Sequence, residues 1–230
     1  MTKIFQILFL LIILNCKAQF GKEPIINKEN FDKQRVHFGY FLGMNAIDFK
    51  FKYKNLPIEE VLVGTSIGFN LGLVANLRLS EFFNLRFEPG FYFNQRNLSF
   101  PGFTKTFDQN REVKSTYIHF PLLLKFSALR TGNIRPYLVG GFGTALNLSS
   151  NAMVIDDNKN NVFRMTKATN FYEIGFGVDI FFEYFKFSPS IRGVFSLNDE
   201  LIRDNDPNSP WTGNIESMST RGIFVNFTFH

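Results

Sequence analysis

The chain has 230 residues, of which 45% are hydrophobic, and a net charge of +5. This length allows one domain or, less readily, two, and the small charge without a basic cluster argues against a nucleic-acid-binding protein. Phenylalanine is the exception in an otherwise ordinary composition, with 31 residues. So much aromatic surface requires an unusually apolar environment, which a lipid bilayer provides.

Residues 1–18 predict a secretory signal peptide. Lys3 supplies a positive start, residues 4–14 are apolar except for Gln6, and Ala18 suits cleavage before Gln19. The apolar run is too short for a transmembrane helix. Lipidation at Cys16 is the alternative, because an apolar stretch precedes it. Cleavage after Ala18 leaves no cysteine and 23 basic against 20 acidic residues, a net charge of +3, so no disulfide is expected.

The segment after the signal, residues 19–35, is polar and without periodicity, and we expect it to lie in the periplasm as an N-terminal extension. No later apolar stretch reaches the about 18 residues of a transmembrane helix. Only helices and closed barrels satisfy their backbone hydrogen bonds in lipid. A membrane protein built from this chain must therefore be a barrel, which we place at residues 36–230.

Alternation with period two dominates from residue 36 onward. Its clearest case is 67–79, where apolar residues from Ile67 to Leu79 share one face and Gly, Asn, Val and Arg share the other. A helix would repeat its apolar positions near 3.6 residues instead. The same pattern predicts strands at 85–93, 172–182, 185–195 and 222–229, and less sharply at 37–51, 116–128 and 135–148.

The eight predicted strands are joined by connections that alternate in length. Long ones fall at 52–63, 97–114, 149–168 and 197–219, and short ones at 80–82, 129–133 and around Glu183. Short periplasmic turns and long extracellular loops are typical of outer-membrane barrels. The sequence thus predicts an all-β fold, an eight-stranded antiparallel transmembrane β-barrel with both termini in the periplasm.

The polar faces of these strands carry charges among many small residues, which suits a crowded interior of eight strands. We expect the charges to pair inside the lumen and to plug it, because a buried network is stable only when its members are paired. A soluble, lipocalin-like barrel with the apolar face inward is the alternative. Phe-rich strand ends at 82–83, 181–182 and 184–185 favour the membrane, as an aromatic girdle. The predicted lumen network consists of Arg78, Arg86, Glu88, Lys125, Glu173, Asp179, Lys186 and Arg192.

Residues that could carry chemistry are few, and we expect no catalytic, cofactor-binding or metal site. Ser115 and His119 share one face of a predicted strand, but no acid is identifiably placed to orient the histidine. A lipid-modifying barrel enzyme therefore stays open only as a weak alternative. The glycine-rich pieces at 140–143 and 175–177 lie within strands, so they lack the helix that a phosphate loop needs. Outer-membrane lipid is an expected partner, and no nucleic acid or small-molecule substrate is.

Two segments resemble a known family. The runs TYIHFPLLLK at 116–125 and RPYLVGG at 135–141, with the start after Ala18-Gln19, resemble the PorT-like outer-membrane barrels of Bacteroidetes. Within that group the chain looks most like the PorT/SprT proteins of type IX secretion and gliding motility. The resemblance covers nearly all of the mature chain and is more specific for the barrel than for the secretion role. It implies a non-enzymatic component or assembly factor of protein export, working with other secretion-system proteins. A general structural or adhesive barrel is the alternative.

Overall fold

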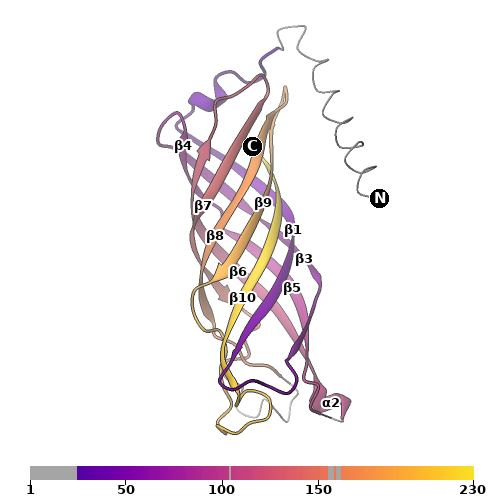
Figure 1. The fold of residues 1–230 in the computed structure, drawn as a ribbon. Coiled ribbons are helices and arrows are strands. Elements are labelled where there is room, and N and C mark those ends of the chain that lie inside the picture. Colours follow the sequence, from indigo (N-terminus) through magenta and orange to yellow (C-terminus); the bar gives the residue numbers. More distant parts are fainter. Residues whose placement is uncertain (1–24, 104, 155–157, 159–161) are drawn as a thin grey trace, which may run out of the picture.

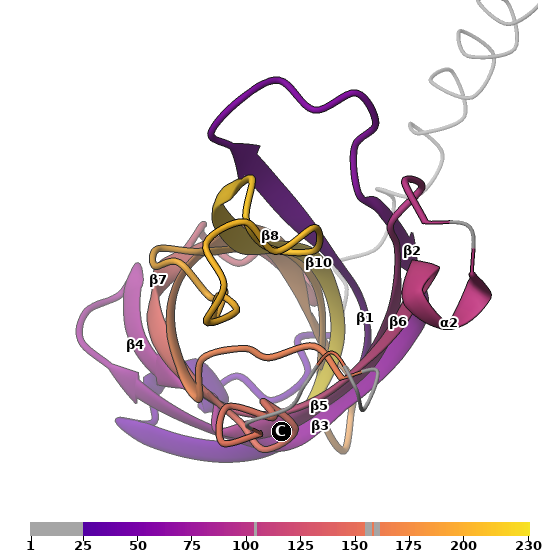
Figure 2. The same ribbon diagram turned by 90° about the horizontal axis from the view of Figure 1, so that it is seen from below.

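The protein is a closed antiparallel barrel. Our computed structural model describes residues 25–103, 105–154, 158 and 162–230, so the predicted signal peptide lies outside the described residues. Ten strands form one sheet, and β1 pairs with both β10 and β3, which closes it (Figures 1 and 2). The strands are β1 (Val36–Tyr53), β2 (Leu62–Thr65), β3 (Ile67–Arg78), β4 (Phe83–Phe87), β5 (Gly90–Ser99), β6 (Asn110–Ser127), β7 (Ile134–Asn147), β8 (Ala168–Phe181), β9 (Lys186–Ser196) and β10 (Ile215–Phe229).

The ring has eight members, because two of them are interrupted strands. β2 and β3 are separated only by Ser66 and both pair with β5, while β4 and β5 are separated by Glu88 and Pro89 and both pair with β6. The predicted all-β fold, an eight-stranded antiparallel barrel, is therefore confirmed. A short 3-10 helix, η2 (Phe31–Lys33), precedes the barrel, and α2 (Thr106–Gln109) lies in a loop.

Several strands extend farther than the sequence pattern predicted. β1 continues to Tyr53, β6 begins at Asn110 and β10 begins at Ile215, so the loops predicted at 97–114 and 197–219 are shorter, at 100–109 and 197–214. The prediction was wrong there because the alternation reverses its polarity toward these loops. Glu112 and Lys114 face outward from β6 while Val113 is buried.

Two prolines, Pro89 and Pro189, lie at breaks in the strand pairing. Pro89 separates β4 from β5, and the Glu88 N–H donates to the Pro121 carbonyl at 3.3 Å across the same break. Pro189 lies where β9 loses its partners on β8, since the pairing skips from Gly177 to Ile180. Proline has no N–H to donate to the neighbouring strand, so each break follows from the residue itself.

The two ends of the barrel differ in the length of their connections (Figure 1). One end, here the short-turn end, carries the turns at 79–82, 128–133 and 182–185 together with the C-terminus and the described part of the N-terminal segment. The long-loop end carries the connections at 54–61, 100–109, 148–167 and 197–214. The predicted alternation of long and short connections is observed. No helix among the described residues is long and apolar enough to span a bilayer.

The outer face changes character along the strands. From the short-turn end the outward side chains are apolar, as in Leu73, Leu122 and Ile174, which are all exposed. Farther along they become polar. The first polar outward residues are Asp48, Gln95, Thr116, Thr144, Asn170 and Arg221. We call the part with the apolar outer face the belt section and the part beyond it the cap section.

Aromatic residues gather where the belt section meets the short turns. Phe82, Phe83, Phe182, Tyr184 and Phe185 are exposed there, as expected of an aromatic girdle at a membrane interface. Phe181, predicted to belong to the same girdle, is instead buried, because strand alternation turns it inward beside its exposed neighbour.

Candidate functional site

The lumen of the belt section contains a chain of ion pairs. Arg86 Nη1 lies 3.0 Å from Glu88 Oε1, and Arg192 Nη2 lies 2.8 Å from Glu88 Oε2. Arg192 continues the chain, with Nη1 3.0 Å from Glu173 Oε2. These side chains come from β4, the break after it, β9 and β8, and each is at most 3% exposed. Charges so deeply buried are stable only because each one has an opposite partner.

A second buried pair lies toward the short-turn end. Lys125 Nζ is 2.6 Å from Asp179 Oδ2 and 3.8 Å from the centre of the Tyr137 ring, and the Ser188 hydroxyl donates to Asp179 Oδ1 at 2.6 Å. Lys186 is also buried, with Nζ 3.3 Å from His37 Nε2. The lysines thus reach oxygen, nitrogen and aromatic partners from several strands.

Seven of the eight residues that the sequence assigned to a lumen network are buried in the belt section. Arg78 is the eighth and lies apart. It is the last residue of β3, partly exposed at a turn, where its Nε donates to the Ser80 carbonyl at 3.3 Å. No carboxylate of the described residues lies within ion-pair distance of it. A strand's last residue is not enclosed by neighbours on both sides, and alternation alone does not show this.

Other buried polar residues were not singled out from the sequence. Asn45 donates to Asn70 Oδ1 at 3.2 Å and accepts from Asn94 Nδ2 at 3.0 Å inside the barrel. Arg96 is fully buried, donates to Ser115 and Tyr117, and lies 3.8 Å from the Phe49 ring. Arg96 continues the inward face of β5, so a longer predicted strand would have identified it.

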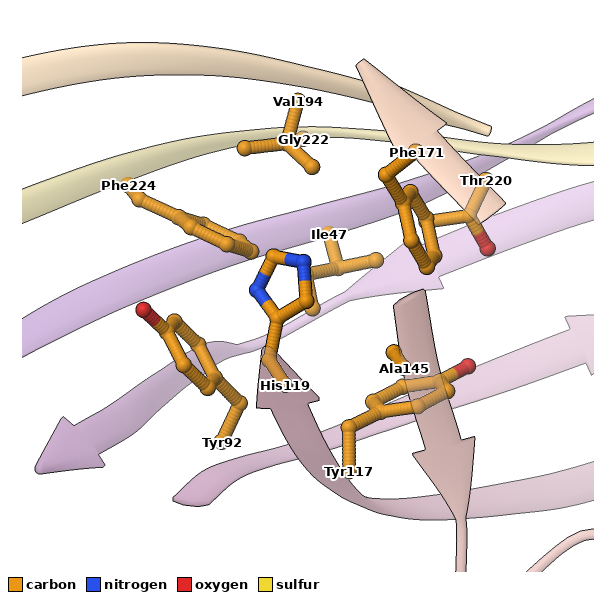
Figure 3. A pocket seen from close by; sticks show the side chains of 10 residues that line it. All are labelled: Ile47, Tyr92, Tyr117, His119, Ala145, Phe171, Val194, Thr220, Gly222 and Phe224. Atoms are coloured by element: carbon orange, nitrogen blue, oxygen red, sulfur yellow. The ribbon is translucent and has the colours of Figure 1, made fainter. Parts of the chain in front are cut away.

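An apolar waist lies in the lumen beyond the ion pairs. It consists of Phe41, Ile47, Val74, Tyr92, Tyr117, Ala145, Phe171, Val194 and Phe224, all buried. The waist encloses a cavity of about 20 Å³, which His119 also lines (Figure 3). Such a volume accommodates about one water molecule. A solute or an unfolded peptide therefore has no path through the waist in this structure.

His119 is held among aromatic rings. Its imidazole packs edge-on against Tyr92 at 5.3 Å and Phe171 at 5.5 Å between ring centres, as Figure 3 shows. His119 Nε2 lies 3.3 Å from Glu173 Oε1, an acid that the sequence could not place there. Glu173 also pairs with Arg192, so this carboxylate is shared.

Ser115 and His119 do not form a catalytic pair. They point inward from β6 four residues apart, which separates them by about 13 Å along a strand. Ser115 is bonded to Arg96, and both Ser115 and His119 are buried in the lumen, away from lipid. Among the described residues, no three His, Cys, Asp or Glu side chains gather closely enough to hold a metal ion.

The cap section closes the long-loop end with an apolar cluster. The cluster contains Phe49, Leu98, Phe100, Val113, Phe163, Met165, Leu201, Ile215 and Met218. Glu200 is buried next to it and accepts hydrogen bonds from the Thr220 N–H at 2.7 Å and the Thr220 hydroxyl at 2.9 Å. Burial raises the pKa of this carboxyl above its ordinary value.

The opposite end is crossed by residues 25–35, which we call the N-terminal strap. The Asn27 N–H donates to Asn133 Oδ1 at 2.9 Å, and Asp32 pairs with Arg130 at 3.4 Å and Arg135 at 3.3 Å. Phe31 packs against the His37 ring at 4.8 Å between ring centres. The strap is thus fastened to the barrel by polar contacts and by an aromatic one.

Comparison with known proteins identifies the family. Residues 18–201 match the family model described as outer membrane protein beta-barrel domain. The chain belongs to this family. It is therefore an outer-membrane protein, and its apolar belt is the surface that faces lipid. No curated protein matches the chain.

Solved structures of small outer-membrane barrels are similar to it. Neisserial surface protein A is 7% identical, with a TM-score of 0.48, and the match covers 85% of this chain and 98% of that one. The outer-membrane protein OprG of Pseudomonas aeruginosa is 12% identical, with a TM-score of 0.48 and coverage of 84% and 95%. The attachment invasion locus protein Ail of Yersinia pestis, solved with the heparin analogue sucrose octasulfate, is 10% identical, with a TM-score of 0.38 and coverage of 85% and 99%.

Proposed function

We propose that this barrel is a non-enzymatic component or assembly factor of type IX protein secretion and gliding motility. The main observation that supports this proposal is the sealed lumen. Ion pairs fill the belt section, and the waist leaves a cavity of about 20 Å³. Cargo cannot use such a lumen, so the protein acts through its surfaces. The specific pathway is supported by the resemblance of residues 116–125 and 135–141 to the PorT-like barrels.

In this proposal the belt anchors the protein and its two ends contact other secretion-system proteins. The short turns and the termini face the periplasm, as is usual for outer-membrane barrels. Residues 1–18 are removed as a signal peptide, residues 19–35 form the periplasmic segment, and residues 36–230 form the barrel. The strap would fix where the segment leaves the barrel, since Asn27 and Asp32 are bound to the barrel's turns.

A deletion strain tests the role in secretion. Loss of the protein is expected to stop release of type IX cargo into the medium and to stop gliding, and the wild-type gene is expected to restore both. The measurements are cargo in the cell-free medium and colony spreading. Cargo released at the wild-type level by the deletion strain would remove the secretion role and leave the barrel fold untouched.

A strap variant tests how the protein acts. Replacing Asn27 and Asp32 by alanine removes side-chain contacts to the Phe181 carbonyl, Arg130 and Arg135 and is expected to reduce co-purification of partner proteins from outer-membrane fractions. Glu29→Ala is the matched control, because Glu29 is exposed on the same segment. Equal recovery of partners with both variants would contradict a role for the strap.

A general adhesive barrel is the second candidate, and the cap section favours it. Leu56 and Ile58 are fully exposed on the 54–61 loop, and Ile58 lines a groove with Tyr53, Phe103 and Trp211. Binding of purified protein to surface ligands, lost in Leu56→Ser with Ile58→Ser and retained in Met153→Ser on another loop, would favour this function. A lipid-modifying enzyme gains no support, since Ser115 and His119 are buried apart from each other.

A further inference from the structure

The basic residues at the short-turn end are unevenly distributed. Lys33 is the last residue of the strap's helix η2, and Arg35 follows shortly after it. The Arg78 N–H donates to the Arg35 carbonyl at 2.8 Å, which brings the end of β3 beside them. Together with Leu77, Leu79, Ser80 and Glu81 these three residues line a hollow of about 480 Å³ on the rim of the barrel. Three cations and one carboxylate give the lining a net charge of +2.

These cations have no acidic partners in the part of the chain that the structure describes. Lys33 Nζ bonds to the Asn30 side chain at 3.2 Å and Arg78 Nε to the Ser80 carbonyl at 3.3 Å, both neutral groups. The neighbouring Arg130 and Arg135 are different, because they share Asp32. The hollow therefore presents charge that the protein itself leaves unneutralised.

The hollow also has an apolar wall. Leu77 lies on the outward face of β3, and Leu79, the first residue after the strand, is 54% exposed. This face is the edge of the lipid-facing belt nearest the short turns, and the exposed Phe82 and Phe83 lie where the turn ends and β4 begins. The hollow thus lies across the border between hydrocarbon and water, with leucines on one side and cations on the other.

We propose that this hollow binds the headgroup of an anionic phospholipid. The lipid phosphate would lie among Lys33, Arg35 and Arg78, and an acyl chain would follow Leu77 and Leu79 into the belt. Basic clusters beside an apolar membrane surface attract anionic headgroups by about 1 kcal/mol per cation. Arginine suits phosphate because its planar guanidinium donates two parallel hydrogen bonds.

A second hollow on the belt shows why the charges matter. It is lined by Leu42, Leu71, Gly72 and Phe91 among other mostly apolar residues, and none of the lining residues is an acid or a base of the Asp, Glu, His, Lys or Arg type. Any acyl chain fits there, so it cannot distinguish one headgroup from another. The rim hollow combines both properties and can select a lipid by charge.

Native mass spectrometry of the folded, purified chain tests the proposal. The probes are phosphatidylglycerol and phosphatidylethanolamine with identical acyl chains, and inorganic phosphate as the probe without chains. We expect phosphatidylglycerol to be retained preferentially. The variant Lys33→Gln, Arg35→Gln, Arg78→Gln is expected to weaken its retention roughly 100-fold, because three cations worth about 1 kcal/mol each are lost.

The control removes the same number of charges elsewhere. Lys50, Lys52 and Lys114 are exposed on the cap section, so changing these three to glutamine is expected to leave lipid retention unchanged. Heat-modifiable gel mobility verifies that both variants fold. Equal retention of the two lipids, an unaffected rim variant or an equal loss in the control would each overturn the site. If inorganic phosphate displaced phosphatidylglycerol completely, the hollow would be a phosphate site and not a lipid site. None of these outcomes bears on the secretion role.

Discussion

The belt section and the cap section of this barrel are built from the same strands with opposite polarity. In β6, Lys125 is buried and Leu124 faces lipid in the belt, whereas Val113 is buried and Lys114 faces water in the cap. The belt encloses ion pairs and the cap encloses an apolar cluster. The medium outside each section, hydrocarbon or water, therefore decides which residues face outward.

The largest expected effect comes from unpairing the belt lumen. Glu88→Ala leaves Arg86 and Arg192 buried without their shared carboxylate and is expected to cost about 3–5 kcal/mol of folding free energy. Urea unfolding of the barrel in lipid vesicles measures it. Asp48→Ala is the control, because it breaks an exposed pair with Arg221 and should cost at most about 1 kcal/mol. Similar losses for both would contradict the enclosed network.

The stability of the cap section should depend on its apolar packing and not on ion pairs. Leu98 is fully buried in its apolar cluster, so Leu98→Ala is expected to destabilise the cap by about 2–5 kcal/mol through the lost contacts and the cavity left behind. Faster proteolysis of the long loops with unchanged heat-modifiable mobility would show that the effect is confined to the cap. The exposed Leu62→Ala is the control and should be neutral. A cap no more accessible to protease than in the wild type would contradict this packing.

The cost of placing a charge on the outer face should differ between the belt section and the cap section. Ile174 faces lipid from β8, so Ile174→Arg is expected to cost about 2–4 kcal/mol near the middle of the bilayer. Gln95→Arg places the same charge on the cap's outer face and is expected to change the unfolding free energy by about 0–1 kcal/mol. Unfolding from vesicles measures both. Equal costs would mean that the border between the sections is misplaced.

The smallest effect concerns pH and the cap. Because burial raises the pKa of Glu200, the folded cap favours the protonated carboxyl. Stability is then greatest below the ordinary pKa of glutamate and falls as the pH rises through the raised value. Protease resistance of the long loops, followed against pH, should show this decline in the wild type and not in Glu200→Gln. A decline of the same size in Glu200→Gln would assign it to other groups.

Most of the charged residues that face the lumen could be predicted from the sequence, but the ion pairs that they form could not. Alternation placed Arg86, Glu88 and Arg192 on polar faces, yet these residues come from strands whose register across the ring no local pattern reveals. Arg78 followed the same alternation and still lies at the rim, since a strand's end is not enclosed. Glu173 beside His119 likewise depends on β8 and β6 flanking β7 in a register that brings the two side chains together.

The sequence by itself determined the eight members of the ring, the alternation of long and short connections, and the division of each belt strand into an apolar and a polar face. These follow from local alternation and turn residues, which need no knowledge of distant neighbours. Only the tertiary structure decided how the cap packs, where the strap lies and which charges meet. Closing the sheet pairs β1 with β10, which brings Asp48 and Arg221 side by side although they are far apart in the sequence. This closure depends on the whole ring and not on any local segment.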